Sequence, residues 1–132
     1  MYNFLEDTLK ELHENKKTEK EVLWVGSHDG KYSITWDSFQ KIAKNINFHN
    51  DNQTHFIASD LVVVGGGWWL ERDVWEVSSY WFFKQLPPSP TAGTKSFSVL
   101  YEDWIYSEHI AELNEDKTDD QLVDAGRQKN GI

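Results

Sequence analysis

Two stretches of the chain carry apolar residues at the spacing of an amphipathic helix. Residues 5–12 place three leucines on one face, and Asn3 stands where a helix cap is expected. Residues 36–46 repeat the pattern with Trp, Phe and Ile, and Thr35 precedes them as a cap. The pattern therefore predicts two helices, each with one face for a core.

The strands are predicted from shorter apolar or alternating runs. Residues 22–34 indicate a hairpin, because a short apolar run is followed by an Asp-Gly turn and an alternating segment. The β-branched run 61–64 ends in three glycines, which favour a tight turn, and the aromatic runs 68–75 and 80–86 follow as two more strands. Between helix and strand, the Asn- and Asp-rich segment 47–55 has no period and is predicted to be a loop.

Three prolines after residue 86 end strand pairing, since proline has no N–H for the ladder. Beyond them, residues 95–101 predict one more strand and residues 107–113 a short helix. The expected fold is α+β, with a small antiparallel sheet of about five or six strands packed with two helices, plus the short C-terminal helix. We expect one domain over residues 1–113 and a polar, flexible tail over 114–132.

Strand alternation divides the aromatic hairpin into two faces. An even-numbered loop within residues 76–79 gives one mostly apolar core face, with Arg72 near Trp81 as a cation–π neighbour. That face consists of Trp68, Leu70, Arg72, Val74, Trp81 and Phe83. The other face mixes rings with charges and consists of Trp69, Glu71, Asp73, Trp75, Tyr80, Phe82 and Lys84. An odd-numbered loop would exchange the faces of the second strand.

The mixed face contains the candidate binding site. Four rings and a carboxylate on a half-wet surface are typical of an interaction patch, and the predicted binding residues are Trp69, Glu71, Trp75, Tyr80 and Phe82. The alternative is that a helix or the C-terminal segment covers these rings, as small α+β domains bury most of their tryptophans. The decisive quantity is the solvent exposure of the rings.

Composition narrows the classes of partner and the compartment. The chain has 22 acidic and 13 basic residues, a net charge of −9, which disfavours binding to nucleic acid. It has no cysteine, no apolar signal segment near the start and no long apolar run, so a cytoplasmic protein that does not enter a membrane is expected. No cofactor motif is present, and the expected partner is another protein, with the oligomeric state open and a homodimer included.

An enzyme is the alternative class of function. A carboxylate pair of Glu71 with Asp60 or Asp73 would suit acid–base chemistry, with Arg72 beside it. His49, Asp51 and His55 offer ligands for zinc or manganese in a spacing that matches no known metal motif. Adjacent residues 27–29 contain the letters of a hydrolase triad but sit on one turn and cannot converge. A small hydrolase or metal-dependent enzyme thus remains the second hypothesis, and no metal site is assigned.

Residues 22–86 resemble a family of short uncharacterised bacterial and prophage proteins. The resemblance lies in "WVGSHDG" and in a strand with "WWLER", which in the family is followed by an Asp-Gly turn and an aromatic strand ending in Phe-Lys. This chain departs from the pattern at Glu76-Val77, in place of Asp-Gly, and in the loop "FHNDNQTH". The resemblance implies a shared α+β fold, association with mobile elements and no established activity. Together with the aromatic face, it favours an accessory protein that binds a host protein.

Overall fold

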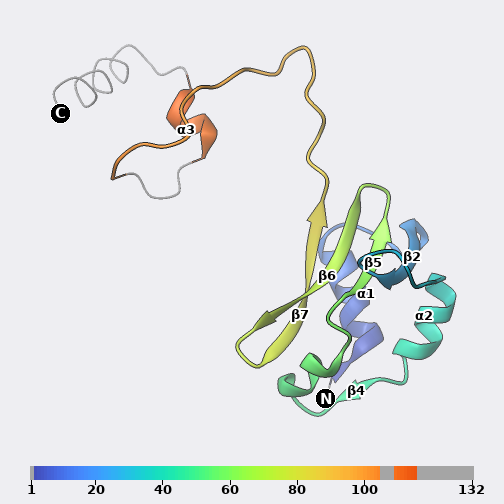
Figure 1. The fold of residues 1–132 in the computed structure, drawn as a ribbon. Coiled ribbons are helices and arrows are strands. Elements are labelled where there is room, and N and C mark those ends of the chain that lie inside the picture. The colour runs from blue at the N-terminus through green and yellow to red at the C-terminus, as the bar shows by residue number, and fades with distance from the viewer. Residues whose placement is uncertain (1, 105–108, 116–132) are drawn as a thin grey trace. The chain divides into compact units, whose positions relative to one another are not determined.

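The computed structural model describes residues 2–104 and 109–115. By its internal contacts the chain divides into two compact units, residues 1–88 and residues 89–132, and each is treated separately below. In the first unit, two helices and a five-stranded sheet confirm the predicted α+β class (Figure 1). The predicted boundary between a domain at 1–113 and a tail at 114–132 stays a prediction, because most of that tail lies outside the described residues.

Both predicted helices of the first unit form where their caps place them. Helix α1 (Phe4–Glu14) begins after Asn3, whose side chain accepts a hydrogen bond from the backbone N–H of Glu6. Helix α2 (Trp36–Ala43) begins after Thr35, whose hydroxyl oxygen accepts from the N–H of Ser38. These bonds satisfy N–H groups that have no partner inside the helix, which fixes where each helix starts.

The main sheet is antiparallel throughout, in the order β3-β2-β5-β6-β7. Its strands are β2 (Val22–Ser27), β3 (Ser33–Ile34), β5 (Leu61–Gly65), β6 (Trp68–Trp75) and β7 (Ser78–Gln85). Two residues, Gly66 and Gly67, connect β5 to β6, and Gly67 has a φ of 76°, which glycine adopts without strain. Every strand predicted before the prolines is confirmed.

The segment between α2 and β5 differs from the predicted loop. It contains strand β4 (Asn47–Phe48), paired with β1 (Tyr2–Asn3), and a 3-10 helix, η2 (Asp51–Phe56). A second 3-10 turn, η1 (Glu19–Glu21), leads from α1 into β2. The segment is structured because it is anchored: the Ser79 N–H donates to the Thr54 hydroxyl over 2.9 Å, and the Ser79 hydroxyl donates to the Thr54 carbonyl over 2.8 Å.

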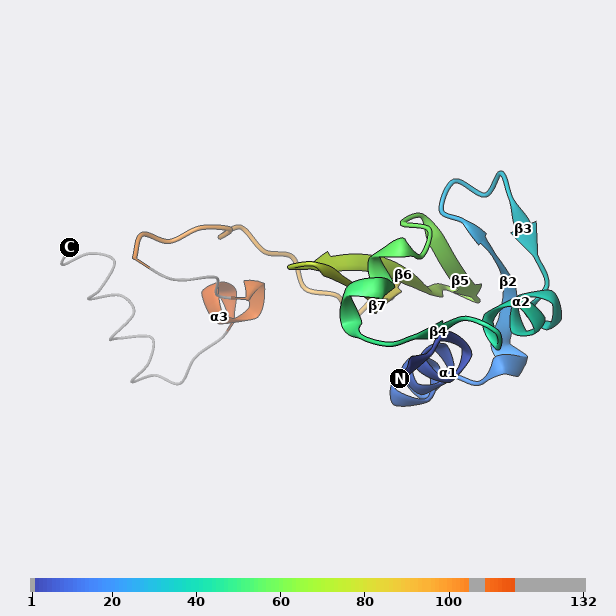
Figure 2. The same cartoon turned by 90° about the horizontal axis from the view of Figure 1, so that it is seen from below.

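One face of the sheet, here called the inner face, packs against the helices. The core joins Phe4 and Leu12 of α1 and Phe39 and Ala43 of α2 to side chains of the sheet, which are Val25, Val63, Trp68, Leu70 and Trp81. In Figure 2, α1 lies below the strands β6 and β7. Both helices contribute to this core, so α1 and α2 lie on the same side of the sheet.

In the second unit, the structure does not form the predicted strand over residues 95–101. Its backbone is bound instead by one side chain: the Asn114 amide accepts from the Val99 N–H over 2.9 Å and donates to the Val99 carbonyl over 2.9 Å. The prediction was wrong because alternation indicates a strand only where another strand is available to pair with it. The short helix is present as α3 (Ile110–Asn114), three residues later than predicted at its start.

Candidate functional site

The loop of the aromatic hairpin decides which side chains share a face, and it has two residues. Trp75 pairs with Ser78 across Glu76-Val77, and Glu76 has a φ of 59°. The loop is therefore even-numbered, and Arg72 pairs with Trp81 while Glu71 pairs with Phe82. The predicted assignment of faces is confirmed for the whole hairpin.

On the inner face, the charged residue of the hairpin is buried among rings. The Arg72 guanidinium lies 4.6 Å from the ring centre of Trp81 and 5.4 Å from that of Phe4. Its Nη2 donates to the carbonyl and the hydroxyl of Ser79, at 2.9 and 2.7 Å. Burial lowers the pKa of Arg72 to about 10, and nearby Asp7 opposes that shift. Arg72 therefore stays protonated at neutral pH and serves the core.

The outer face of the sheet, defined as the face turned away from α1 and α2, carries all five predicted binding residues. Trp75 is 69% exposed, Phe82 41% and Tyr80 39%, while Trp69 and Glu71 are half-buried. The Trp69 indole Nε1 donates to Glu71 Oε1 over 2.7 Å, which holds ring and carboxylate together. The Tyr80 hydroxyl lies 3.4 Å from the Asp51 carboxylate of η2. The outer side of β6 and β7 is thus a strip with three exposed rings and with acidic groups among them.

A hollow of about 240 Å³ extends this strip toward β2, and the sequence analysis did not include it in the site. We call it the two-tryptophan hollow, and it is lined by Trp24, His28, Val62, Val64 and Trp69. The sheet register explains its shape, because Trp24 pairs with Val64 and Val64 pairs with Trp69. The two indoles therefore stand on either side of a low valine floor. Alternation within residues 22–27 and 61–65 was the signal that could have located it.

Of the groups in the enzyme hypothesis, Glu71 and Asp73 share the outer face of the sheet. Arg72 and Glu71 point to opposite faces of the sheet, and Arg72 is only 7% exposed. His49 and His55 are exposed around η2, where His55 contacts the Asn52 carbonyl instead of another ligand-type side chain. Within residues 2–104 and 109–115, no group of three or more His, Asp or Glu side chains is arranged to hold a metal ion. Asp60 belongs to a different cavity.

That cavity, of about 480 Å³, is mostly apolar and is lined by residues of β2, β3 and the start of β5, among them Val25, Ile34, Leu61 and Asp60. Near its rim the Ser27 hydroxyl donates to the Asp29 carboxylate over 2.7 Å and accepts from the Tyr32 N–H over 3.0 Å. The hydroxyl thus helps to shape the hairpin turn. The hydrogen bonds that Asp29 accepts from the Lys31 backbone N–H and from the Ser27 hydroxyl lower the pKa of Asp29.

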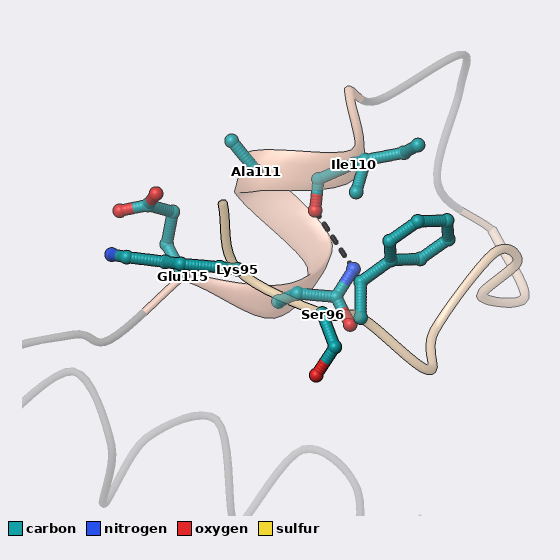
Figure 3. A pocket seen from close by; sticks show the side chains of 7 residues that line it. Lys95, Ser96, Ile110, Ala111 and Glu115 are labelled. Carbon is teal, nitrogen blue, oxygen red and sulfur yellow. Dashed lines mark hydrogen bonds between the residues drawn. The ribbon is translucent and has the colours of Figure 1, made fainter. Parts of the chain in front are cut away.

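The second unit has a cavity of its own, of about 310 Å³, between residues 95–97 and α3 (Figure 3). The dashed line marks the bond from the Asn114 amide to the Ile110 carbonyl, at 2.8 Å. Since Asn114 also binds Val99, this side chain holds the small unit together, and the cavity gathers no set of catalytic groups.

Comparisons with protein-family models, with curated proteins and with solved structures found no match for this chain. The resemblance to bacterial and prophage proteins therefore stays a prediction. In the part of the chain that the structure describes, no helix has the length and apolar character needed to cross a membrane.

Proposed function

We propose that this protein is a binding module without enzymatic activity, and that the outer face of its sheet binds another protein. The observation that carries the proposal is the exposure of Trp75, Tyr80 and Phe82 on one face of the hairpin. Exposed rings gathered on one surface mark interaction sites, and aromatic residues supply much of the energy at the centres of protein interfaces. The resemblance to prophage proteins makes a host protein the expected class of partner.

A photo-crosslinking experiment tests this proposal. A benzoylphenylalanine at position 82 replaces a ring of the outer face, and the same group at position 56 replaces Phe56, which is 77% exposed on η2 and serves as the matched control. In cells of the source organism, we expect position 82 to crosslink one defined protein and position 56 not to crosslink it.

The crosslinked protein is then purified and its affinity is measured by calorimetry. We expect Trp75→Ala and Phe82→Ala each to weaken binding at least tenfold, as removal of a central ring costs about 2 kcal/mol or more at an interface. Phe56→Ala should leave the affinity unchanged. Unchanged affinity in both outer-face variants, with their circular dichroism spectra intact, would show that this face is not the binding surface.

A further inference from the structure

The two-tryptophan hollow has the dimensions of a slot for one flat group. Adjacent strands lie about 4.8 Å apart, so the backbones of Trp24 and Trp69, with β5 between them, are separated by roughly 10 Å. Side chains stand nearly perpendicular to a sheet, so both indoles rise beside Val64. Val62, 2% exposed, completes an apolar floor. A planar group that enters the hollow meets aromatic walls and an apolar base.

A carboxylate lies beside this hollow, hydrogen-bonded to one of its walls, with hydrogen-bonding capacity left over. Glu71 neighbours Val62 across the strand pair and accepts the Trp69 indole N–H on Oε1. No other hydrogen bond to Glu71 is formed by the described residues, so Oε2 is available as an acceptor. Asp73 follows on the same face, Lys84 lies on the far side of Trp69 from the hollow, and the imidazole of His28 is one of the groups that line the hollow. The local charge favours a cation, in agreement with the net charge of −9.

The inner face provides a measure of what such rings can bind. There the Arg72 guanidinium lies over the ring of Trp81 and next to that of Phe4, which itself stacks on Trp81, so this fold already holds a guanidinium against an indole. On the outer face the hollow has two indoles, the ring type that binds cations best, and the Glu71 carboxylate lies beside them. Arg72, by contrast, has no carboxylate within ion-pair distance among the described residues.

We propose that the two-tryptophan hollow binds an arginine side chain of the partner protein. The guanidinium lies flat against the indoles of Trp24 and Trp69 and donates to the free oxygen of Glu71. Arginine fits better than lysine because its planar, weakly hydrated head stacks on rings and donates several hydrogen bonds in one plane. This inference rests on the proposed function, since it assigns the chemistry of the partner's anchoring residue.

The test is a titration of the full chain with three blocked tripeptides, Gly-Arg-Gly, Gly-Lys-Gly and Gly-citrulline-Gly. Citrulline keeps the shape of arginine and removes its charge. The readout is the NMR signal of each indole N–H, assigned from single Trp→Phe variants. We expect the arginine peptide to shift the signals of Trp24 and Trp69 and to leave Trp75 unshifted. The citrulline and lysine peptides should bind at least tenfold and threefold more weakly, respectively.

Glu71→Gln keeps the size of the side chain and should weaken arginine binding at least fivefold. Phe56→Ala, which removes an exposed ring that does not line the hollow, is the control and should not change it. Trp24→Ala should abolish the shifts, and if that variant does not fold, Glu71→Gln decides. The inference would be overturned if the citrulline and arginine peptides bound equally well. It would also be overturned if the Trp24 and Trp69 signals did not shift at a peptide concentration about 10-fold above a millimolar dissociation constant.

The failure of this inference is separable from the failure of the proposed function. The titration uses no partner, whereas the crosslinking experiment uses no arginine peptide. If the peptide does not bind but Phe82→Ala still weakens partner binding, the outer face is an interface and the assignment of arginine is wrong. If neither effect is seen, the outer face has no binding role.

Discussion

Neighbouring residues of β6 show how the two faces of this sheet use the same chemistry differently. Arg72 and Glu71 each lie against a tryptophan, and each is hydrogen-bonded to its surroundings. On the inner face, helix α1 covers the pair, and its Phe4 ring stacks on Trp81 beside Arg72. On the outer face Glu71 and Trp69 are only half-buried, and α1 and α2 pack against the other side of the sheet. A ring beside a charge is therefore a structural element where it is covered and a candidate binding site where it is open.

The two charged groups also differ in how well their polar atoms are satisfied. Two nitrogens of Arg72, Nε and Nη1, are buried and donate no hydrogen bond in the described structure. A buried polar atom without a partner costs free energy, so the contribution of Arg72 to stability depends on its ring contacts and on Ser79. Glu71 is partly exposed, and water can satisfy its free oxygen. The inner face is consequently more sensitive to substitution than the outer face.

The largest expected difference between the faces concerns Trp81 and Phe82, which are consecutive in β7. Trp81 is 5% exposed, stacks on Phe4 at 5.6 Å and donates its indole N–H to Thr8. We expect Trp81→Ala to lower the free energy of unfolding by about 3–5 kcal/mol, because it opens a cavity and removes that bond. Phe82→Ala should lower it by less than about 1 kcal/mol. Urea denaturation measures both, and a loss at Phe82 as large as that at Trp81 would mean that the outer ring is buried in solution.

A smaller difference is expected for the charged pair. Arg72→Lys keeps the positive charge but removes the flat group that lies against the rings of Trp81 and Phe4, and we expect a loss of about 1–3 kcal/mol in the free energy of unfolding. Glu71→Gln, the matched change on the outer face, should stay within about 0.5 kcal/mol of the parent. Thermal melting of both variants checks the pair. A Glu71 variant less stable than the Arg72 variant would reverse the roles assigned to the two faces.

The order of elements was predictable wherever short-range rules decide the structure. Asn3 and Thr35 mark helix starts through local hydrogen bonds. The sequence left an even- or odd-numbered loop open within residues 76–79, and the structure has the even one, Glu76-Val77. The five predicted binding residues do share a face, because alternation within one hairpin places them there. Their exposure was not predictable, since it depends on which side of the sheet the helices cover.

What the sequence analysis missed depends on contacts between distant segments. The two-tryptophan hollow needs the pairing of β2 with β5, which brings Trp24 beside Val64 over a long loop. The structure around η2 depends on hydrogen bonds from Ser79 to Thr54. The segment 95–101 alternates like a strand, yet Asn114 binds its backbone. In each case the local sequence pattern allowed the segment to pair with several other segments, and the fold of the whole chain selects one of them.

The pKa of Asp7, on the helix that covers the inner face, gives a pH-dependent test of how the inner and outer faces of the sheet differ. Asp7 of α1 is partly buried, and this burial raises its pKa above the ordinary value of 3.8, although Arg72 and Lys10 oppose the shift. Between 3.8 and the raised pKa, the folded protein binds a proton that the unfolded chain has released. The free energy of unfolding therefore falls as the pH rises through this window, and at neutral pH the charged Asp7 carries the cost of its burial.

Asp7→Asn removes that cost and should raise the free energy of unfolding at pH 7, by less than about 1 kcal/mol because solvent screens a partly exposed carboxylate. At pH 3, where Asp7 is protonated in both states, the difference should vanish. Glu6→Gln, exposed on the same helical turn, is the matched control for the helix dipole and should lower stability slightly at pH 7. Urea denaturation at the two pH values measures both variants. If Asp7→Asn were less stable at pH 7, the attraction between Asp7 and Arg72 would outweigh the cost of burying the Asp7 carboxylate. The Arg72 guanidinium would then be held by charge as well as by the rings around it.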